Sequence, residues 1–161
     1  MTAHLKTVSN AKEISVREDA EKKFIFRRRV YLSDTNAQGN VYFARFFEWQ
    51  GEVREEYLRV AVPNHPALFK TGFHLLTVEA AAEYKGESKL YDPIEISLTA
   101  PWIKRASFQL DFNMVNVETG QPLSSGRQVI ACADAEGKLI EIPLEIKNAL
   151  LQIHPLRTKK S

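Results

Sequence analysis

Long apolar runs and the residues of common metal or disulfide centres are missing from this sequence. No stretch approaches the ~20 apolar residues that cross a bilayer, and the N-terminal residues lack the apolar run of a signal peptide. One cysteine, Cys132, excludes an internal disulfide framework, and the four histidines never occur at metal-ligand spacing. We therefore expect a cytoplasmic protein with no membrane partner, no metal and no cofactor.

A strong net charge and glycine-rich loops are missing as well. The 22 Lys and Arg against 20 Asp and Glu leave a net charge of +2, which offers no bulk attraction for nucleic acid. The seven glycines are too scattered for a phosphate-binding loop, and no Gly-x-Ser-x-Gly elbow of a serine hydrolase occurs. The composition that is present, 44% hydrophobic and 26% charged residues in 161, is typical of one globular domain.

Regular structure is predicted to begin at Phe24. Residues 1–23 are polar and lack periodicity, so we predict a flexible tail, followed by one domain over 24–153 and a basic C-terminal tail over 154–161. Alternating and branched residues predict strands at 24–33, 73–85, 94–103, 104–117, 123–134 and 139–142. Prolines mark a loop at 61–71 and the start of a C-terminal helix over 144–153.

The longest helix is predicted between residues 41 and 59. A polar turn that contains Asp34, Asn36 and Gly39 precedes it, and Asn40 is the expected N-cap. The next proline is Pro63, so nothing interrupts a helix of about 28 Å at 1.5 Å per residue.

A helical wheel of this segment places two polar residues, Gln50 and Arg54, on its apolar side. A guanidinium stays charged, so one that is aimed at a core requires a buried partner or a ligand. The pattern leaves open for Arg54 a structural ion pair, a side chain that extends to solvent, or a ligand site, and for Gln50 a satisfied core amide. All carboxylates of the helix lie on the opposite side, so this face offers no obvious general base.

The predicted elements follow the order strand, long helix, then four or five consecutive antiparallel strands, which is typical of an α+β fold. The apolar arc of the helix exceeds half its circumference, so a flat sheet cannot cover it. We therefore predict a long central helix wrapped by a curved antiparallel sheet of five to six strands.

The segment 34–58 reads DTNAQGNVYFARFFEWQGEVREEYL and closely resembles the hotdog-fold thioesterases of the 4-hydroxybenzoyl-CoA thioesterase type. In members that hydrolyse CoA esters, a catalytic aspartate occupies the position of Asn36. Asn36 with segments 39–43 and 48–51 resembles instead the thioesterases of iterative polyketide synthases that make enediyne polyene precursors, which release a polyene from an acyl carrier protein. Phe46 departs from this subfamily, which more often has Tyr there.

The resemblance implies that Asn36 and Arg54 are the catalytic residues, lying close together, and that an acyl carrier protein is the partner. Because the first turn of a helix has free N–H groups and the positive end of the helix dipole, the thioester oxygen is expected near Asn40, Tyr42 and Phe43. Asn36 cannot take a proton at neutral pH, so it is expected to position water or substrate.

Three residues of the helix, Phe46, Phe47 and Gln50, are predicted to line a channel for a linear acyl chain. The resemblance also implies a homo-oligomer, either a dimer or a dimer of dimers, with sites where chains meet. Two other functions stay open, because position 36 lacks a carboxylate: an acyl-CoA thioesterase of broad specificity, and an acyl-chain-binding module without catalysis.

Overall fold

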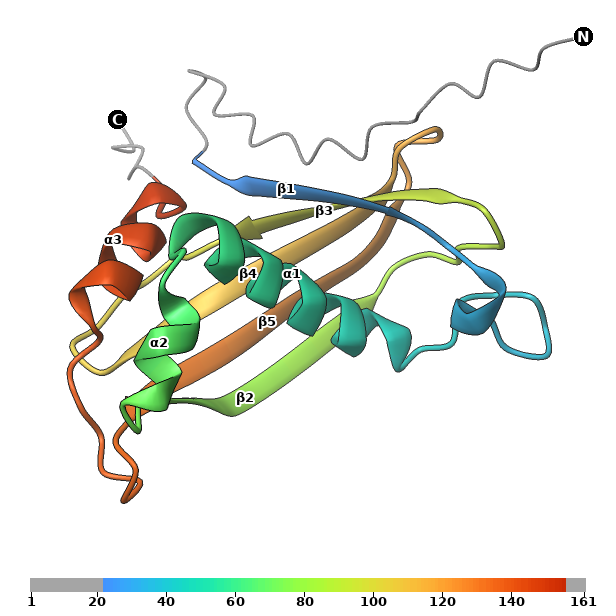
Figure 1. Cartoon of the computed structure of the whole chain (residues 1–161). Coiled ribbons are helices and arrows are strands. Elements are labelled where there is room, and N and C mark those ends of the chain that lie inside the picture. The colour runs from blue at the N-terminus through green and yellow to red at the C-terminus, as the bar shows by residue number, and fades with distance from the viewer. Residues whose placement is uncertain (1–21, 156–161) are drawn as a thin grey trace, which may run out of the picture.

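The computed structural model describes residues 22–155 (Figure 1). A curved antiparallel sheet holds one long helix, α1, against its inner face, and two shorter helices, α2 and α3, lie near the C-terminal end of α1. The predicted wrapped-helix architecture is confirmed, with five strands. The predicted tails, 1–23 and 154–161, lie almost wholly outside the described residues, so the domain boundaries at 24 and 153 stay predictions.

The sheet contains β1 (Phe24–Arg29), β2 (His74–Tyr84), β3 (Pro93–Thr99), β4 (Ser107–Asn116) and β5 (Pro122–Ala133). Their order is β1-β3-β4-β5-β2, and every neighbouring pair is antiparallel. β1 and β2 are therefore the two edges. The strand predicted at 139–142 is wrong: only an isolated bridge joins Leu139 to Ala133. The Ile140 N–H still donates to Cys132 O of β5, but the Ile142 N–H donates to Arg105 O outside any strand, so the segment leaves β5 before a ladder forms.

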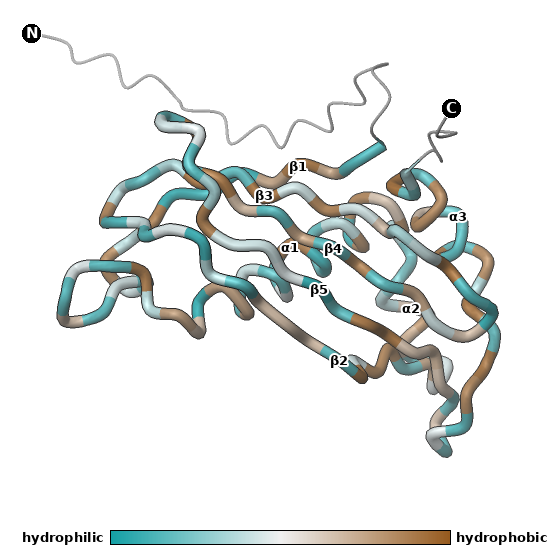
Figure 2. Tube along the Cα trace, turned by 180° about the vertical axis from the view of Figure 1, so that it is seen from behind, coloured by the Kyte–Doolittle hydropathy of each residue, from teal (hydrophilic) through white to brown (hydrophobic). Residues whose placement is uncertain are grey.

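The strands form where side chains alternate between the core and the outer face. Ile94, Ile96 and Leu98 of β3 are wholly buried, and the residues between them are half-buried. Figure 2, seen from behind the sheet, shows the same alternation of apolar and polar positions along β4. Each fully buried side chain of this kind contributes roughly 1.5–3 kcal/mol, so register slips that turn these residues outward are strongly disfavoured.

Helix α1 spans Arg45–Ala61 and buries Phe46, Trp49, Gln50, Val53, Tyr57 and Leu58. It begins four residues later than predicted, so Asn40 as N-cap is wrong. The reason lies in the preceding chain: the N–H of Val41 donates to Ser88 O and that of Tyr42 donates to Asp34 O, which fixes both residues in extended pairing. The N-cap is Ala44, and no side chain caps the helix.

Two shorter helices close one end of the sheet. α2 (His65–Lys70) lies inside the stretch predicted as a loop, and that prediction is wrong there. Pro66 stands in the first turn of α2, where its missing N–H breaks no hydrogen bond, so the proline starts the helix instead of preventing it. α3 (Leu144–Gln152) agrees with the predicted C-terminal helix and follows Pro143.

Candidate active site

The predicted catalytic turn is held together by its own asparagine. Asn36 N–H donates to Asn40 O at 2.8 Å, and Asn36 Oδ1 accepts the N–H groups of Gln38 (2.9 Å) and Asn40 (3.3 Å). Gly39 has a φ of 81°, which a residue with a side chain rarely adopts. The side-chain oxygen of Asn36 is therefore occupied within the turn, whereas its Nδ2 donates to no group among residues 22–155 and can serve a ligand.

The carboxylate that precedes this turn is committed to structure. Asp34 is buried, and its Oδ2 accepts from Arg28 Nη2 at 3.0 Å and from the N–H of Tyr31 at 2.9 Å. Arg28 also bonds Glu52 at 2.7 Å, and its guanidinium lies over the Trp49 ring, 4.4 Å from the centroid. Asp34 thus ties the turn to β1 and, through Arg28, to α1. With its Oδ2 committed to these bonds, it is poorly suited to serve as a base.

The chain just before α1 offers two free backbone N–H donors, those of Phe43 and Ala44, and only Phe43 was predicted. The N–H of Tyr42 is occupied by Asp34 O at 2.9 Å, so its predicted role as an oxyanion donor is wrong. The N–H groups of Phe43 and Ala44 donate to no acceptor in the described part of the chain. They lie directly before the 17-residue α1, whose positive dipole end favours a developing negative charge.

Arg54 points at the sheet, as the helical wheel predicts. Its Nη1 donates to Thr77 Oγ1 of β2 and to Gln128 Oε1 of β5, both at 2.9 Å. No carboxylate lies within ion-pair distance of it among residues 22–155. Burial lowers the pKa of the Arg54 guanidinium, and the charge of Glu55 partly opposes that shift, so the group stays cationic at neutral pH.

The three residues predicted to line a channel differ in exposure. Phe46 is 3% exposed and packs on the rings of Trp49 and Tyr84, with centroids 5.2 and 5.4 Å away. Gln50 is wholly buried and donates through Nε2 to Ala81 O at 3.2 Å, whereas Phe47 is 37% exposed. Phe46 and Gln50 thus belong to the packed interior of the single chain, and a channel role stays a prediction for all three.

A single chain does not bring Asn36 and Arg54 together. Arg54 stands nine residues after the first residue of α1, about 14 Å along the axis at 1.5 Å per residue. The turn that carries Asn36 projects beyond the N-terminal end of α1 (Figure 1), and no described hydrogen bond joins the two residues. No contact within one chain joins the two residues among residues 22–155, so their predicted closeness, at a site where chains meet, stays a prediction.

The edge strand beside Arg54 carries a bulge. In β2, Thr77 pairs with Ile130 and Glu79 pairs with Val129, so Val78 is an extra residue. A one-residue insertion reverses the alternation of a strand, and Thr77 before it and Ala80 after it can both face α1. The bulge thus brings the Thr77 hydroxyl to Arg54.

Sequence reasoning missed two residues that hold the guanidinium, Thr77 and Gln128. Gln128 had a detectable signal, since it alternates with Gly126 and Ile130 on the inner face of β5 and is a polar residue at a core position. Thr77 had none, because the bulge that orients it is not readable from residue types.

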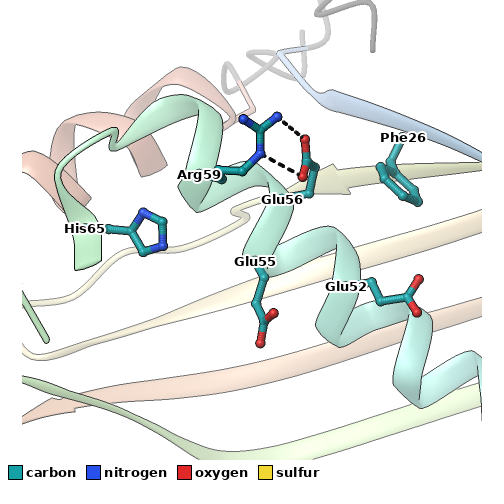
Figure 3. A pocket seen from close by; sticks show the side chains of 6 residues that line it. All are labelled: Phe26, Glu52, Glu55, Glu56, Arg59 and His65. Carbon is teal, nitrogen blue, oxygen red and sulfur yellow. Dashed lines mark hydrogen bonds and ion pairs between the residues drawn. The ribbon is translucent and has the colours of Figure 1, made fainter. Parts of the chain in front are cut away.

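A separate hollow of about 470 Å³ lies on the outer face of α1 (Figure 3). It is lined by Phe26, Glu52, Glu55, Glu56, Arg59 and His65. Arg59 turns to Glu56 and bonds it at 2.6 Å, which uses its charge within the helix. The hollow contains none of the predicted site residues, and a lining rich in carboxylates does not suit an apolar chain.

Within residues 22–155, every helix is too short or too polar to span a bilayer. In the same range, no three His, Cys, Asp or Glu side chains come together in the way that a metal site requires. The polar groups around Arg54 at the sheet side of α1 include the Thr77 hydroxyl and the amides of Gln128 and Gln50.

Comparison with known proteins identifies the family and the fold. The profile of the thioesterase-like superfamily matches residues 30–150. Crystal structures of the dynemicin thioesterase, which reveal induced-fit and allosteric effects upon polyene binding, include one with 31% identity and a TM-score of 0.77, covering 83% of this chain and 99% of that one. The 1,4-dihydroxy-2-naphthoyl-CoA thioesterase of Synechocystis has 25% identity and a TM-score of 0.76, with coverage of 83% and 99%.

A relative identified from its sequence gives the same class of enzyme. The acyl-CoA thioesterase YbgC of Haemophilus influenzae is 29% identical over 128 residues, which are 78% of this chain and 93% of that protein. These matches confirm the predicted hotdog fold and the predicted class of enzyme. This chain belongs to the thioesterase-like superfamily and is a thioester hydrolase.

Proposed function

We propose that this enzyme releases a long polyene acyl chain, including chains with a β-keto group, from the acyl carrier protein of an iterative polyketide synthase, and that it does so without a catalytic carboxylate. The likeness to the dynemicin thioesterase at 31% identity supports the polyene substrate. Asn36 at the position of the usual aspartate supports a mechanism without a carboxylate.

The observation that carries the proposal is that Arg54 is a half-buried cation with unused hydrogen-bond donors. Its Nη1 makes two hydrogen bonds to neutral partners, and its Nε and Nη2 make none within the described residues. A half-buried cation without a carboxylate attracts an electron-rich oxygen. A thioester oxygen or a β-keto oxygen satisfies that demand.

The reaction uses positioned donors and water. The N–H groups of Phe43 and Ala44 receive the oxyanion as water adds to the thioester carbonyl. Asn36 Nδ2 donates to the water or to the substrate and accepts no proton, so the attacking water loses its proton to solvent. The C–S bond then breaks, the leaving thiolate takes a proton from solvent, and the carrier thiol and the free acid leave. Such a site hydrolyses an already labile thioester slowly.

We infer that the complete site forms between two chains. β2 pairs with β5 on one side only, and Leu76, Val78 and Tyr84 along it are 41%, 61% and 46% exposed. An open strand edge of this kind is satisfied when two copies pair about a two-fold axis. Pairing through β2 would place the Asn36 turn of one chain near Arg54 of the other. The two residues would then form one site although no contact joins them within the described residues of one chain.

The aromatic residues at the head of α1 suit the acyl chain. The rings of Phe43 and Tyr84 lie 6.5 Å apart, and Tyr84 Oη donates to Phe43 O at 3.2 Å. Phe47 is partly exposed on the same helix. These surfaces offer apolar contact to a linear chain whose thioester lies at the free N–H groups.

The test is hydrolysis of matched thioesters. A polyene acyl chain and a saturated acyl chain are each presented on acyl carrier protein and on CoA, and free acid and methyl ketone are followed by mass spectrometry with wild type, Arg54→Ala and no protein. Faster release from the carrier protein, lost in Arg54→Ala, supports the proposal. Faster turnover of the CoA esters favours the broad acyl-CoA thioesterase, and stoichiometric binding without turnover favours the binding module.

A further inference from the structure

Two glutamines form a buried polar row beneath α1 that the reaction as proposed leaves unused. Gln128 of β5 is 5% exposed and Gln50 of α1 is wholly buried. Their neighbours on the inner face of β5, Ile130 and Cys132, are wholly buried apolar groups. A primary amide is costly to bury unless hydrogen bonds satisfy it, so its presence at two adjoining core positions requires a reason.

The row is a directed chain of hydrogen bonds. Arg54 Nη1 donates to Gln128 Oε1 at 2.9 Å, Gln128 Nε2 donates to Gln50 Oε1 at 3.3 Å, and Gln50 Nε2 donates to Ala81 O at 3.2 Å. Arginine can only donate and a carbonyl can only accept, so both amides have one permitted orientation. The guanidinium is thereby connected to the backbone of β2 through two side chains of fixed direction.

Gly126 makes room for this chain. A Cβ at position 126 would lie 2.2 Å from Gln50 Nε2 and 2.8 Å from Gln50 Cδ. Only glycine therefore lets the Gln50 amide rest against β5, where it meets Gln128. The close approach is a second observation, independent of the hydrogen bonds, that this part of the sheet is shaped around the amide row.

We propose that Gln128 is a positioning residue for Arg54, and that it is an amide because an amide holds the guanidinium without neutralising it. A carboxylate at this position would form an ion pair and take up the charge that the substrate oxygen needs. Gln128 and Thr77 occupy Nη1 only, so Nε and Nη2 make no hydrogen bond within residues 22–155 and are available to a ligand. This inference rests on the proposed role of Arg54.

The decisive variant is Gln128→Glu, which keeps an oxygen acceptor for Arg54 Nη1 and adds a negative charge. It also removes the donor to Gln50 Oε1, a loss that the new ion pair to Arg54 offsets, so we expect a folded protein. We expect its kcat for β-keto acyl carrier protein to be reduced by about 10- to 100-fold, with a smaller change in KM. A merely structural glutamine predicts the opposite, because the retained hydrogen bond would preserve kcat. A kcat within twofold of wild type overturns the inference.

Gln128→Leu and Gly126→Ala separate the links of the row. Gln128→Leu frees Arg54 and is expected to lower kcat by about 10- to 100-fold, whereas Gly126→Ala displaces Gln50 alone and is expected to lower it by about 2- to 10-fold. In the Arg54→Ala background, Gln128→Leu should change the remaining rate less than twofold, because its effect passes through the arginine. A full additional loss in that background overturns the inference.

Gln109→Leu is the matched control. Gln109 of β4 also makes two side-chain hydrogen bonds, accepting from Trp102 Nε1 and donating to Asp111, and it has no bond to the row. This variant should keep the wild-type kcat. A wild type without hydrolysis of any thioester counts against the proposed function, whereas an active wild type that needs Arg54 and tolerates Gln128→Glu counts against the positioning role alone.

Discussion

The Tyr57 hydroxyl donates a 2.5 Å hydrogen bond to the carbonyl oxygen of Ala149 and thereby joins α1 to α3. Both residues are buried, with Tyr57 6% and Ala149 1% exposed. The ring of Phe24 packs on Tyr57 with its centroid 5.1 Å away, so strand β1 meets the same junction. This bond anchors the C-terminal end of the central helix.

Tyr57→Phe is expected to lower the free energy of unfolding by about 1–3 kcal/mol, because the Ala149 carbonyl would stay buried without a donor. Chemical denaturation measures the change. Tyr91→Phe is the control, since Tyr91 is 61% exposed and should lose less than 0.5 kcal/mol, roughly the limit for a surface change. Equal losses in the two variants would contradict the role of the buried bond.

The same hydroxyl gives a pH dependence. Burial raises the pKa of Tyr57 well above its usual value, so the folded protein keeps a proton that the unfolded chain releases near about pH 10. Its contribution is present below about pH 10 and declines as the pH rises above it. Tyr57→Phe should therefore show a shallower loss of stability above about pH 10 than wild type.

Cys132 should be inert in the folded protein. It is wholly buried, and burial raises the pKa of its thiol to about 11. The thiolate is the reactive form, so a thiol reagent at about pH 8 should label Cys132 only as fast as the protein opens. An added Val117→Cys, at a position that is 46% exposed, should react within the mixing period. Rapid labelling of Cys132 in native wild type would contradict its burial.

Side-chain alternation was enough to predict most of the sheet. The period of two along Ile94, Ile96 and Leu98 specifies both the strand and its buried face, and the observed β3 follows it. The apolar arc of α1 predicted a wrapped helix for the same reason, since burial of apolar area dominates the packing. The inward direction of Arg54 followed from the wheel alone.

Features that depend on contacts between distant segments were not predictable from residue types. Asn40 is a good N-cap residue, yet the pairing of Val41 with Ser88 and of Tyr42 with Asp34 outweighs a preference worth about 1 kcal/mol. The bulge at Val78 depends on register, which the sequence does not display. The partners of Arg54 come from two strands, 23 and 74 residues away, so a single-element pattern cannot identify them.

Arg54→Ala is expected to lower kcat by about 100- to 1,000-fold, the usual effect of removing one charge-stabilising donor. Arg54→Lys should recover little of this loss, because an ammonium cannot contact Thr77 and Gln128 and also present two further N–H groups to an oxygen. Steady-state kinetics with acyl carrier protein thioesters measures both. Full activity of Arg54→Lys would show that charge alone suffices and would contradict the proposed geometry.

Asn36→Asp should give the site a general base. A carboxylate can accept the N–H groups of Gln38 and Asn40 as the amide oxygen does, so the turn is preserved, and it adds the base that wild type lacks. General-base catalysis contributes about 100- to 10,000-fold, so hydrolysis of acyl-CoA should increase clearly. Asn36→Ala is the control, because alanine can neither accept the N–H groups of the turn nor act as a base. Loss of activity in both variants would mean that the Asn36 Nδ2 donor is required and that a carboxylate at position 36 cannot replace it, which contradicts this prediction.

A mixture of Asn36→Ala and Arg54→Ala chains tests the site between two chains. Each variant alone has no intact site, whether the two residues act in one chain or across a pair. If they act across a pair, a mixed dimer has one site with both mutations and one with neither. Random exchange at equal amounts then recovers about a quarter of wild-type activity, because half the dimers are mixed and each has one intact site of two. Light scattering before mixing checks that both variants form dimers. Mixed dimers as inactive as the parents would place both residues in one chain, and the pairing of the Asn36 turn with Arg54 across β2 would be rejected.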